Sequence, residues 1–351
     1  MHMADALLSP AVGGSMWAAS AGAIAYSSAK VRRELDDRKV PLMGVLGAFL
    51  FAAQMINFSI PGTGSSGHLG GGLLLAILLG PHAAFLTIAS VLIVQALFFA
   101  DGGLLALGCN IFNMGFFPAF VVYPFIYRNL AGSCPGRGRE TWVTVLCAVI
   151  GLQLGPFAVV LETVASGIAE LPFGTFLLLM LPIHLAIGVV EGVVTAAIVS
   201  FVRKARPEIL EPAATAAPAG GVWPLRRVLL GFLLLAVVTG GVVSAFASKD
   251  PDGLEWAIAR ITGGSELKAR GALHQSLARL QDTVALFPEY DFRSSALKPE
   301  PAAAPRAERP LSVHPGTSLA GMIGSLAVLL LVVASGLFLK KRNLRKAYGI
   351  H

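Results

Sequence analysis

Three nitrogen donors lie together at the start of the chain. Met1 carries a free α-amine, and His2 adds a backbone amide and an imidazole. These groups can wrap one metal ion in two fused small rings, and a second imidazole would complete four nitrogens in a plane. A planar set of four nitrogens favours Ni(II) or Cu(II) over Zn(II) or Mg(II). We expect the amine to be retained in the cell, because methionine aminopeptidases rarely remove Met before a side chain as large as His.

A second imidazole, that of His68, follows a Gly/Ser-rich turn at residues 61–67. Taken singly, each histidine has an ordinary explanation: His2 could lie at a frayed terminus, and His68 could hydrogen-bond its own loop. Taken together with the amine, they favour a metal site at Met1, His2 and His68. Asp5 could accept an imidazole N–H beside such a site or cap the first helix, and both alternatives stay open.

The composition indicates which elements position these residues. The chain is 55% hydrophobic and 13% charged, whereas about a quarter of the residues in a soluble domain are charged. Apolar runs of about 18 or more residues recur, which predicts an all-α polytopic membrane protein with about nine transmembrane helices. A β-barrel would show short alternating strands instead. The spans are expected at about 11–29, 41–58, 67–80, 82–100, 103–127, 141–165, 174–202, 225–246 and 319–339, the third being short, Gly-rich and therefore broken or tilted.

The basic residues predict the orientation of these spans. Most of them follow the first, fifth, seventh and ninth spans, which end on one side in a nine-span topology. By the positive-inside rule that side is cytoplasmic, so the N-terminus lies outside and the C-terminus inside. Met1, His2 and His68 then share the outer face. The first seven residues carry no Lys or Arg, so no cleavable signal peptide is expected, and the cysteines form no CxxC pair that would indicate a disulfide framework or a zinc site.

The chain divides into two parts. Residues 1–204 are expected to form a metal-capture membrane domain of about seven helices. Residues 205–224 are rich in Pro, Gly and Ala and indicate a linker. Residues 225–351 are expected to form a two-helix hairpin that encloses an outer loop at 247–318. Every proposed ligand lies in the first part, so we expect residues 1–204 to bind metal alone and the hairpin to be needed for transport.

Two segments of the first part resemble a known family. Met1-His2-Met3-Ala4-Asp5-Ala6-Leu7-Leu8-Ser9-Pro10 and Asn57-Phe58-Ser59-Ile60-Pro61-Gly62-Thr63-Gly64-Ser65-Ser66-Gly67-His68 are similar to motifs of the NikM/CbiM family, the substrate-capture subunits of energy-coupling-factor (ECF) transporters for nickel and cobalt. The resemblance covers about 1–204. It implies high-affinity metal capture by the Met1 amine, the amide and imidazole of His2, and the imidazole of His68. Ser248–Trp256 resembles the PDGLE motif of the small NikN-type subunit, and Phe287–Tyr290 resembles its later Pro-acid-Tyr element.

The resemblance implies capture of Ni(II) outside the cell for ATP-driven import, with Co(II) as the alternative substrate. No GxxxxGK[ST] phosphate loop occurs in the chain. The expected partners are therefore a transmembrane coupling subunit of the EcfT/NikQ type, two ATP-binding subunits of the EcfA/NikO type, and membrane lipid, with no nucleic acid. The expected location is the bacterial inner (plasma) membrane.

Two other functions were weighed against metal capture. An intramembrane serine hydrolase would use Ser65 or Ser66 with His68, but neighbouring turn residues seldom form a nucleophile–base pair and no Asp orients the base. A metal sensor would need a cytoplasmic output domain, and every cytoplasmic segment is short. We therefore expect no enzymatic activity.

Several other polar residues have competing interpretations. Glu162, His184 and Glu191 could relay protons or metal, but hydrogen bonding between helices is favoured. Asn110 and Asn113 are expected to support helix packing. Asp250, Asp252 and Glu255 could bind a hard cation, but a turn and helix start is favoured. His82 lies at the cytoplasmic side, and His274 and His314 are expected to be solvated. A small-residue strip on the first span could contact the coupling subunit or pack within the chain: Ala18, Ala21, Gly22 and Ala25.

Overall fold

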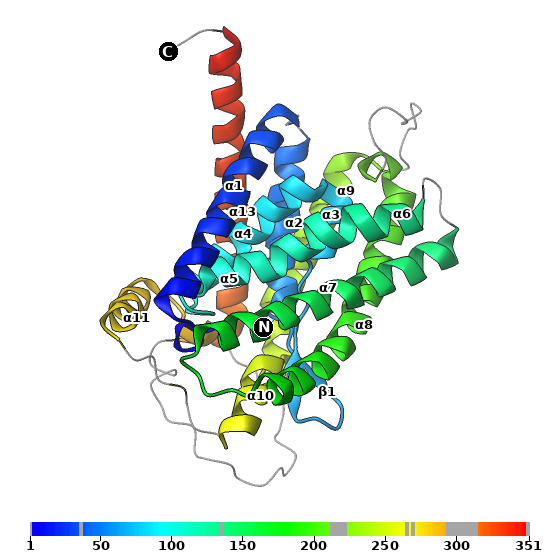
Figure 1. Ribbon diagram of the computed structural model, residues 1–351. Helices are drawn as coiled ribbons and strands as arrows, with labels where there is room; N and C mark the ends of the chain where they lie inside the picture. Colours follow the sequence, from blue (N-terminus) through cyan, green and yellow to red (C-terminus); the bar gives the residue numbers. More distant parts are fainter. Residues whose placement is uncertain are drawn as a thin grey trace.

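The computed structural model describes residues 2–34, 38–132, 136–210, 223–263, 267, 271–292 and 315–348. Within these ranges the chain is mostly helical. Figure 1 shows the long helices as a bundle. The N-terminal segment, α10 (Gly253–Thr262) and α11 (Ala272–Val284) gather at one end, and the carboxyl end of α13 (Pro315–Tyr348) projects from the other.

The first part of the chain supplies most of the bundle. A short 3-10 turn, η1 (Asp5–Leu7), precedes the first long helix. Helix α7 packs along α8, and α4 contacts α1, α2, α3 and η2 at the centre. The other elements, in chain order, are α1 (Pro10–Glu34), α2 (Lys39–Gln54), α3 (Gly72–Leu79), α4 (Pro81–Phe98), α5 (Leu107–Ile111), η2 (Phe112–Tyr127), α6 (Arg128–Ala131), α7 (Arg137–Ser166), α8 (Phe173–Ala205) and η3 (Pro207–Ile209).

Segment η2 is a π-helix rather than an α-helix. It contains Pro118 and Pro124. Each proline lacks a backbone N–H and clashes with the preceding turn of an α-helix, so regular α-helical winding is disfavoured where these two prolines lie. The predicted fifth span is therefore one continuous rod made from α5, η2 and α6.

A β-hairpin interrupts the helices between α2 and α3. Strands β1 (Phe58–Ile60) and β2 (Ser65–Gly67) pair antiparallel, with Ser59 opposite Ser66. The connecting turn needs a left-handed backbone at Gly62 and Gly64, where φ is 78° and 80°. A side chain there would be strained, which explains the glycines of the predicted turn.

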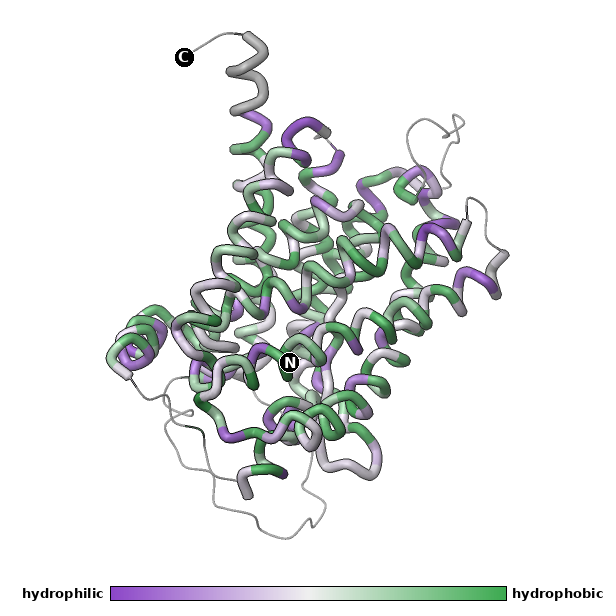
Figure 2. The backbone as a smooth tube through the Cα atoms, in the orientation of Figure 1, coloured by the Kyte–Doolittle hydropathy of each residue, from purple (hydrophilic) through white to green (hydrophobic). Residues whose placement is uncertain are grey.

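Six helical stretches are long and apolar enough to cross a membrane within the described ranges, namely Pro81–Phe98, Leu107–Ala131, Gly138–Ser166, Phe173–Ala205, Leu225–Phe246 and Gly316–Lys341. Three of the nine predicted spans are not among them. Helix α1 is rich in small residues, α2 has 16 residues and α3 has eight. Eight helical residues extend about 12 Å, well short of a bilayer core of about 30 Å. Figure 2 shows hydrophobic residues along the middle of the bundle and hydrophilic ones towards helix ends.

The second part of the chain packs directly on the first. Helices α9 (Leu225–Gly241) and α13 contact each other and α2. They approach closely at Gly321, where an added Cβ would lie 2.1 Å from the carbonyl oxygen of Gly240. Such a crossing requires glycine, as at close helix contacts in membranes. The short turn η4 (Val243–Phe246) precedes the predicted outer loop, which contains α10, α11 and the short turn η5 (Pro288–Tyr290).

Candidate metal-binding site at the N-terminus

The N-terminal segment is anchored inside the bundle rather than frayed. Met3 is fully buried, and its N–H donates to Asn110 Oδ1 at 2.8 Å. The Met3 carbonyl accepts from Asn110 Nδ2 at 3.3 Å and from the N–H of Gly103 at 2.9 Å. Asn110 therefore holds the backbone of residue 3 from both sides, which is a more specific role than the helix packing expected from the sequence.

Asp5 takes neither of its two expected roles. It lies in η1, five residues before the start of α1, and its Oδ1 accepts the Ala106 N–H at 2.9 Å. Burial raises the pKa of Asp5. Its carboxyl group thus ties the N-terminal segment to the connection between α4 and α5.

The structure brings His2 and His68 together. Their rings stack with centroids 5.2 Å apart and planes 17° apart. Burial, followed by nearby positive charge, lowers the pKa of His68 well below its ordinary value. Burial also lowers the pKa of His2. Both imidazoles are therefore kept in the neutral form that metals bind. Met1, the third predicted ligand, lies outside the described residues.

No group of three or more His, Cys, Asp or Glu side chains that could hold a metal ion occurs in the part of the chain that the structure describes.

Two polar groups contact the His2 ring. Nε2 lies 3.1 Å from Gln95 Oε1, and Nδ1 lies 3.2 Å from Asp101 Oδ1. The hydroxyl of Tyr290, in the second part of the chain, donates to Asp101 Oδ2 at 2.5 Å. Sequence reasoning missed Gln95 and Asp101. Asp101 stands at the end of an apolar run, before Gly102 and Gly103, and this position was the signal that could have identified it.

The loop that carries His68 is held by α8. Glu191 accepts the N–H of Gly70 at 2.6 Å and of Gly71 at 3.1 Å. His68 Nδ1 lies 3.1 Å from the carbonyl oxygen of Leu69. A carbonyl can only accept, so Nδ1 carries the proton and the lone pair is on Nε2. The sequence favoured hydrogen bonding between helices for Glu191, but its carboxylate instead accepts from the backbone of the loop.

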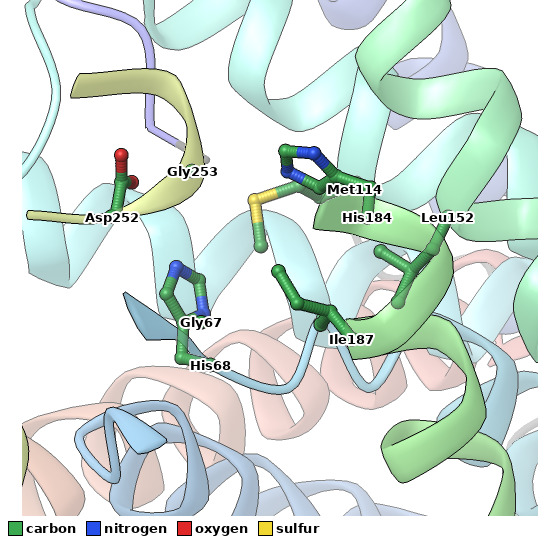
Figure 3. A pocket seen from close by; sticks show the side chains of 9 residues that line it. Gly67, His68, Met114, Leu152, His184, Ile187, Asp252 and Gly253 are labelled. Atoms are coloured by element: carbon green, nitrogen blue, oxygen red, sulfur yellow. The ribbon is translucent and has the colours of Figure 1, made fainter. Parts of the chain in front are cut away.

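His68 faces a cavity that it shares with His184, Met114 and Asp252 (Figure 3). His184 Nδ1 lies 2.8 Å from the Met180 carbonyl one turn earlier in α8. The expected hydrogen bonding between helices is found for Glu162, which accepts from Asn113 Nδ2 at 2.8 Å.

Residues Ser248–Trp256, called the PDGLE segment below, cover this cavity. The Ser66 N–H donates to the Pro251 carbonyl at 2.8 Å, and Ser66 Oγ donates to the Asp250 carbonyl at 2.7 Å. Trp256 Nε1 donates to the Thr63 carbonyl at 3.0 Å. Residues 250–256 therefore lie against β2, next to His68.

Asp252 begins helix α10, so the turn and helix-start interpretation is confirmed. Its side chain accepts the N–H groups of Leu254 and Glu255, and the Glu255 side chain accepts the Asp252 N–H. This is a complete capping box. Burial alone would raise the pKa of Asp252, but nearby positive charge and the N–H of Glu255 lower it, so the carboxylate beside His68 stays ionised.

Helix α11 contacts the N-terminal segment. His274 is 3% exposed and its Nε2 lies 2.9 Å from the Leu8 carbonyl. The expectation that His274 is solvated is therefore wrong: the amphipathic helix buries this face against residue 8. His314 lies outside the described residues.

The chain matches two known protein families. Residues 2–209 match the family described as the cobalt uptake substrate-specific transmembrane region, and residues 226–341 match the PDGLE domain. The putative fused nickel transport protein NikMN of Archaeoglobus fulgidus is 33% identical over 335 residues, which cover 94% of this chain and 96% of that protein. The fused nickel transport protein NikMN of Rhodobacter capsulatus is 33% identical over 234 residues, covering 62% of this chain and 66% of that protein.

A crystal structure described as a transition metal transporter is also similar. It has a TM-score of 0.52 and 31% identity, and the match covers 58% of this chain and 93% of that one. The relatives are metal transport proteins, which implies a transporter rather than an enzyme. The chain is a multi-pass membrane protein that belongs to the family of the cobalt uptake substrate-specific transmembrane region and carries a PDGLE domain at its carboxyl side.

Proposed function

We propose that the protein captures Ni(II) outside the cell, using the Met1 amine, the amide and imidazole of His2, and the imidazole of His68. The observation that carries this proposal is the buried stack of His2 on His68 at 5.2 Å, 66 positions apart in sequence. Two imidazoles this close together, beside an anchored N-terminus, can offer nitrogen donors to one metal ion. Co(II) is the alternative substrate, and cobalt transport proteins are among the relatives.

Covalent geometry decides which His2 nitrogen would bind the ion. A ring closed through the His2 amide nitrogen and Nδ1 contains Cα, Cβ and Cγ and has six members including the metal. Nε2 is further along the imidazole and cannot close a small ring. Nickel is preferred over cobalt because a deprotonated amide in a planar set of four nitrogens suits Ni(II).

The metal content and absorption spectrum of the purified full chain test this function. We expect about one nickel ion per chain and the visible spectrum of square-planar Ni(II) in nitrogen donors. Cobalt retained in preference to nickel would support the alternative substrate. Absence of tight binding of either ion would rule out metal capture.

We further propose that the PDGLE segment acts as a lid on the site. The contacts of Ser66 with residues 250 and 251, and of Trp256 with Thr63, support this role. Tyr290 reaches the site from the same part of the chain, through Asp101. The capture domain at 1–204 would supply every ligand, and the fused part at 225–351 would control exchange of the metal with the outside.

Displacing the lid should slow uptake without removing a ligand. A Cβ at Gly253 would lie 2.7 Å from Ile183 Cγ2 and 3.1 Å from His184 Cε1. In Gly253→Val we expect nickel uptake by cells that supply the partner subunits to fall about tenfold, as a loss of 1.4 kcal/mol in lid docking would give. The equilibrium affinity of the purified protein should change much less. Gly231→Val is the matched control, because an added Cβ at Gly231 meets nothing within 4 Å. Equal uptake by both variants would contradict the lid.

ATP-driven import requires partners of the ECF type. We propose one transmembrane coupling subunit of the EcfT/NikQ type and two ATP-binding subunits of the EcfA/NikO type, in a bacterial plasma membrane with the N-terminus outside. The small-residue strip on α1 supports a place for the coupling subunit. All four of its residues are exposed on this chain, and small residues let another helix approach closely: Ala18, Ala21, Gly22 and Ala25.

The serine hydrolase finds no support in the turn. Ser66 Oγ donates to the Asp250 carbonyl, and Ser65 Oγ lies 2.9 Å from Thr63 Oγ1. His68 Nδ1 donates to a carbonyl in its own loop. A nucleophile would need its hydroxyl on a histidine nitrogen.

A further inference from the structure

A chain of hydrogen bonds joins His2 to the loop of His68. His2 Nε2 lies 3.1 Å from Gln95 Oε1, and Gln95 Nε2 donates to Gln54 Oε1 at 2.9 Å. Gln54 Nε2 then donates to the carbonyl oxygen of Gly70 at 2.9 Å. Gln54 and Gln95 are 5% and 1% exposed, so water cannot replace these partners easily.

The direction of every bond in this chain is set by its last member. The Gly70 carbonyl has no proton, so Gln54 must turn its N–H groups towards it. Gln54 therefore presents its oxygen to Gln95, which must answer with an N–H. The oxygen of Gln95 is then left for His2, and Nε2 of His2 must carry the proton.

We propose that Gln95 and Gln54 are positioning residues that keep the His2 proton on Nε2 and so leave the lone pair of Nδ1 for the metal ion. This inference rests on the proposed function, in which only Nδ1 can close the chelate ring. Without the glutamines, Asp101 Oδ1, 3.2 Å from Nδ1, would favour a proton on that nitrogen. The hydrogen-bond chain through Gln54 and Gln95, called the relay below, opposes this effect of Asp101. A proton moved to Nδ1 would leave the unprotonated Nε2 facing the Gln95 oxygen.

The relay also links the two imidazoles. Gly70 lies two residues after His68, and its N–H is held by Glu191 while its carbonyl receives Gln54. The backbone that positions His68 is therefore the same backbone that orients the proton of His2. The two imidazoles are arranged together, before any metal arrives.

The test uses the full chain labelled with 15N-histidine and free of metal, because the tautomer can be read from the imidazole 15N shifts without metal binding. The resonances of His2 are assigned by their absence in His2→Ala. In the wild type we expect a protonated Nε2. In Gln95→Met and Gln54→Met we expect that preference to be lost and nickel affinity to fall about 10- to 100-fold, as for other outer-shell partners of metal-bound histidines.

Two further variants separate this role from packing. Gln95→Glu keeps an acceptor for Nε2–H and should retain the tautomer. Gln153→Met removes a glutamine whose Nε2 donates to the Leu181 carbonyl at 3.1 Å and should change neither quantity. An unchanged His2 tautomer in both Gln95→Met and Gln54→Met would overturn the proposal, whatever happens to affinity. If the His2 tautomer changes in these variants but the wild-type protein binds no nickel, the relay exists and the proposed function is wrong.

Discussion

Inserting one proline between Met1 and His2 should abolish tight nickel binding. The insertion separates the α-amine from the His2 amide, and the proline nitrogen carries no proton to lose, so it cannot join the chelate as the amide of an inserted alanine would. The anchoring of Met3 by Asn110 leaves the backbone no freedom to compensate by sliding. The loss in affinity should exceed the roughly 100-fold upper range for outer-shell changes. Calorimetric titration of the purified full chain with nickel measures it.

A cleavable extension provides the matched control for this experiment. A protein made with a removable leader before Met1 should bind nickel weakly, and removal of the leader to expose the Met1 amine should restore binding in the same sample. Chemical acetylation of the exposed amine should abolish it again. Nickel binding of unchanged affinity in the extended protein would exclude the amine as a ligand.

Replacing His68 by alanine should weaken nickel binding by a comparable amount. The variant removes one of four proposed nitrogens and the ring that stacks on His2 at 5.2 Å. The loop itself should persist, because Glu191 and Gln54 hold Gly70 independently of the imidazole. We therefore expect a folded protein with a changed nickel spectrum, measured by absorption and by competition titration.

His82→Ala is the control for His68→Ala. His82 stands at the start of α4, where its ring contacts Tyr26 and Phe120 at 5.3 and 5.4 Å, away from His2. Its removal should leave nickel affinity nearly unchanged. His274 is unsuitable as a control, because it is buried and bonds the carbonyl of Leu8. Normal nickel binding by His68→Ala, together with loss in His82→Ala, would refute the proposed ligand set.

The sequence was sufficient for the long apolar helices and for the meeting of His2 with His68. Helices α7 and α8 are long runs with clear boundaries, so their pattern alone predicts them. The two histidines were linked through charge, which placed both on one side of the membrane, and through the chelating chemistry of the first two residues. The expected PDGLE turn was also found, because Asp252 starts a helix with a capping box.

Other features could not be predicted because they depend on long-range contacts. Gln95 and Asp101 meet His2 from more than ninety residues away, and neither belongs to a local motif. The β-hairpin is too short for a visible alternation of residues. His274 belongs to a polar helix, and only its docking on residue 8 buries it. The third span was expected to be broken or tilted, but its exact helical length was not predicted, and α3 is helical over eight residues only.

The contact between the PDGLE segment and β2 makes closure of the site independent of protein concentration. The two surfaces belong to one polypeptide, so their association is intramolecular and its strength depends on a local effective concentration, in the millimolar range for short flexible tethers. Closure over His68 therefore does not depend on how many copies of the protein the membrane holds. A pair of separate chains with the same contacts would open on dilution, whereas this chain should cover its site equally well at low and high expression.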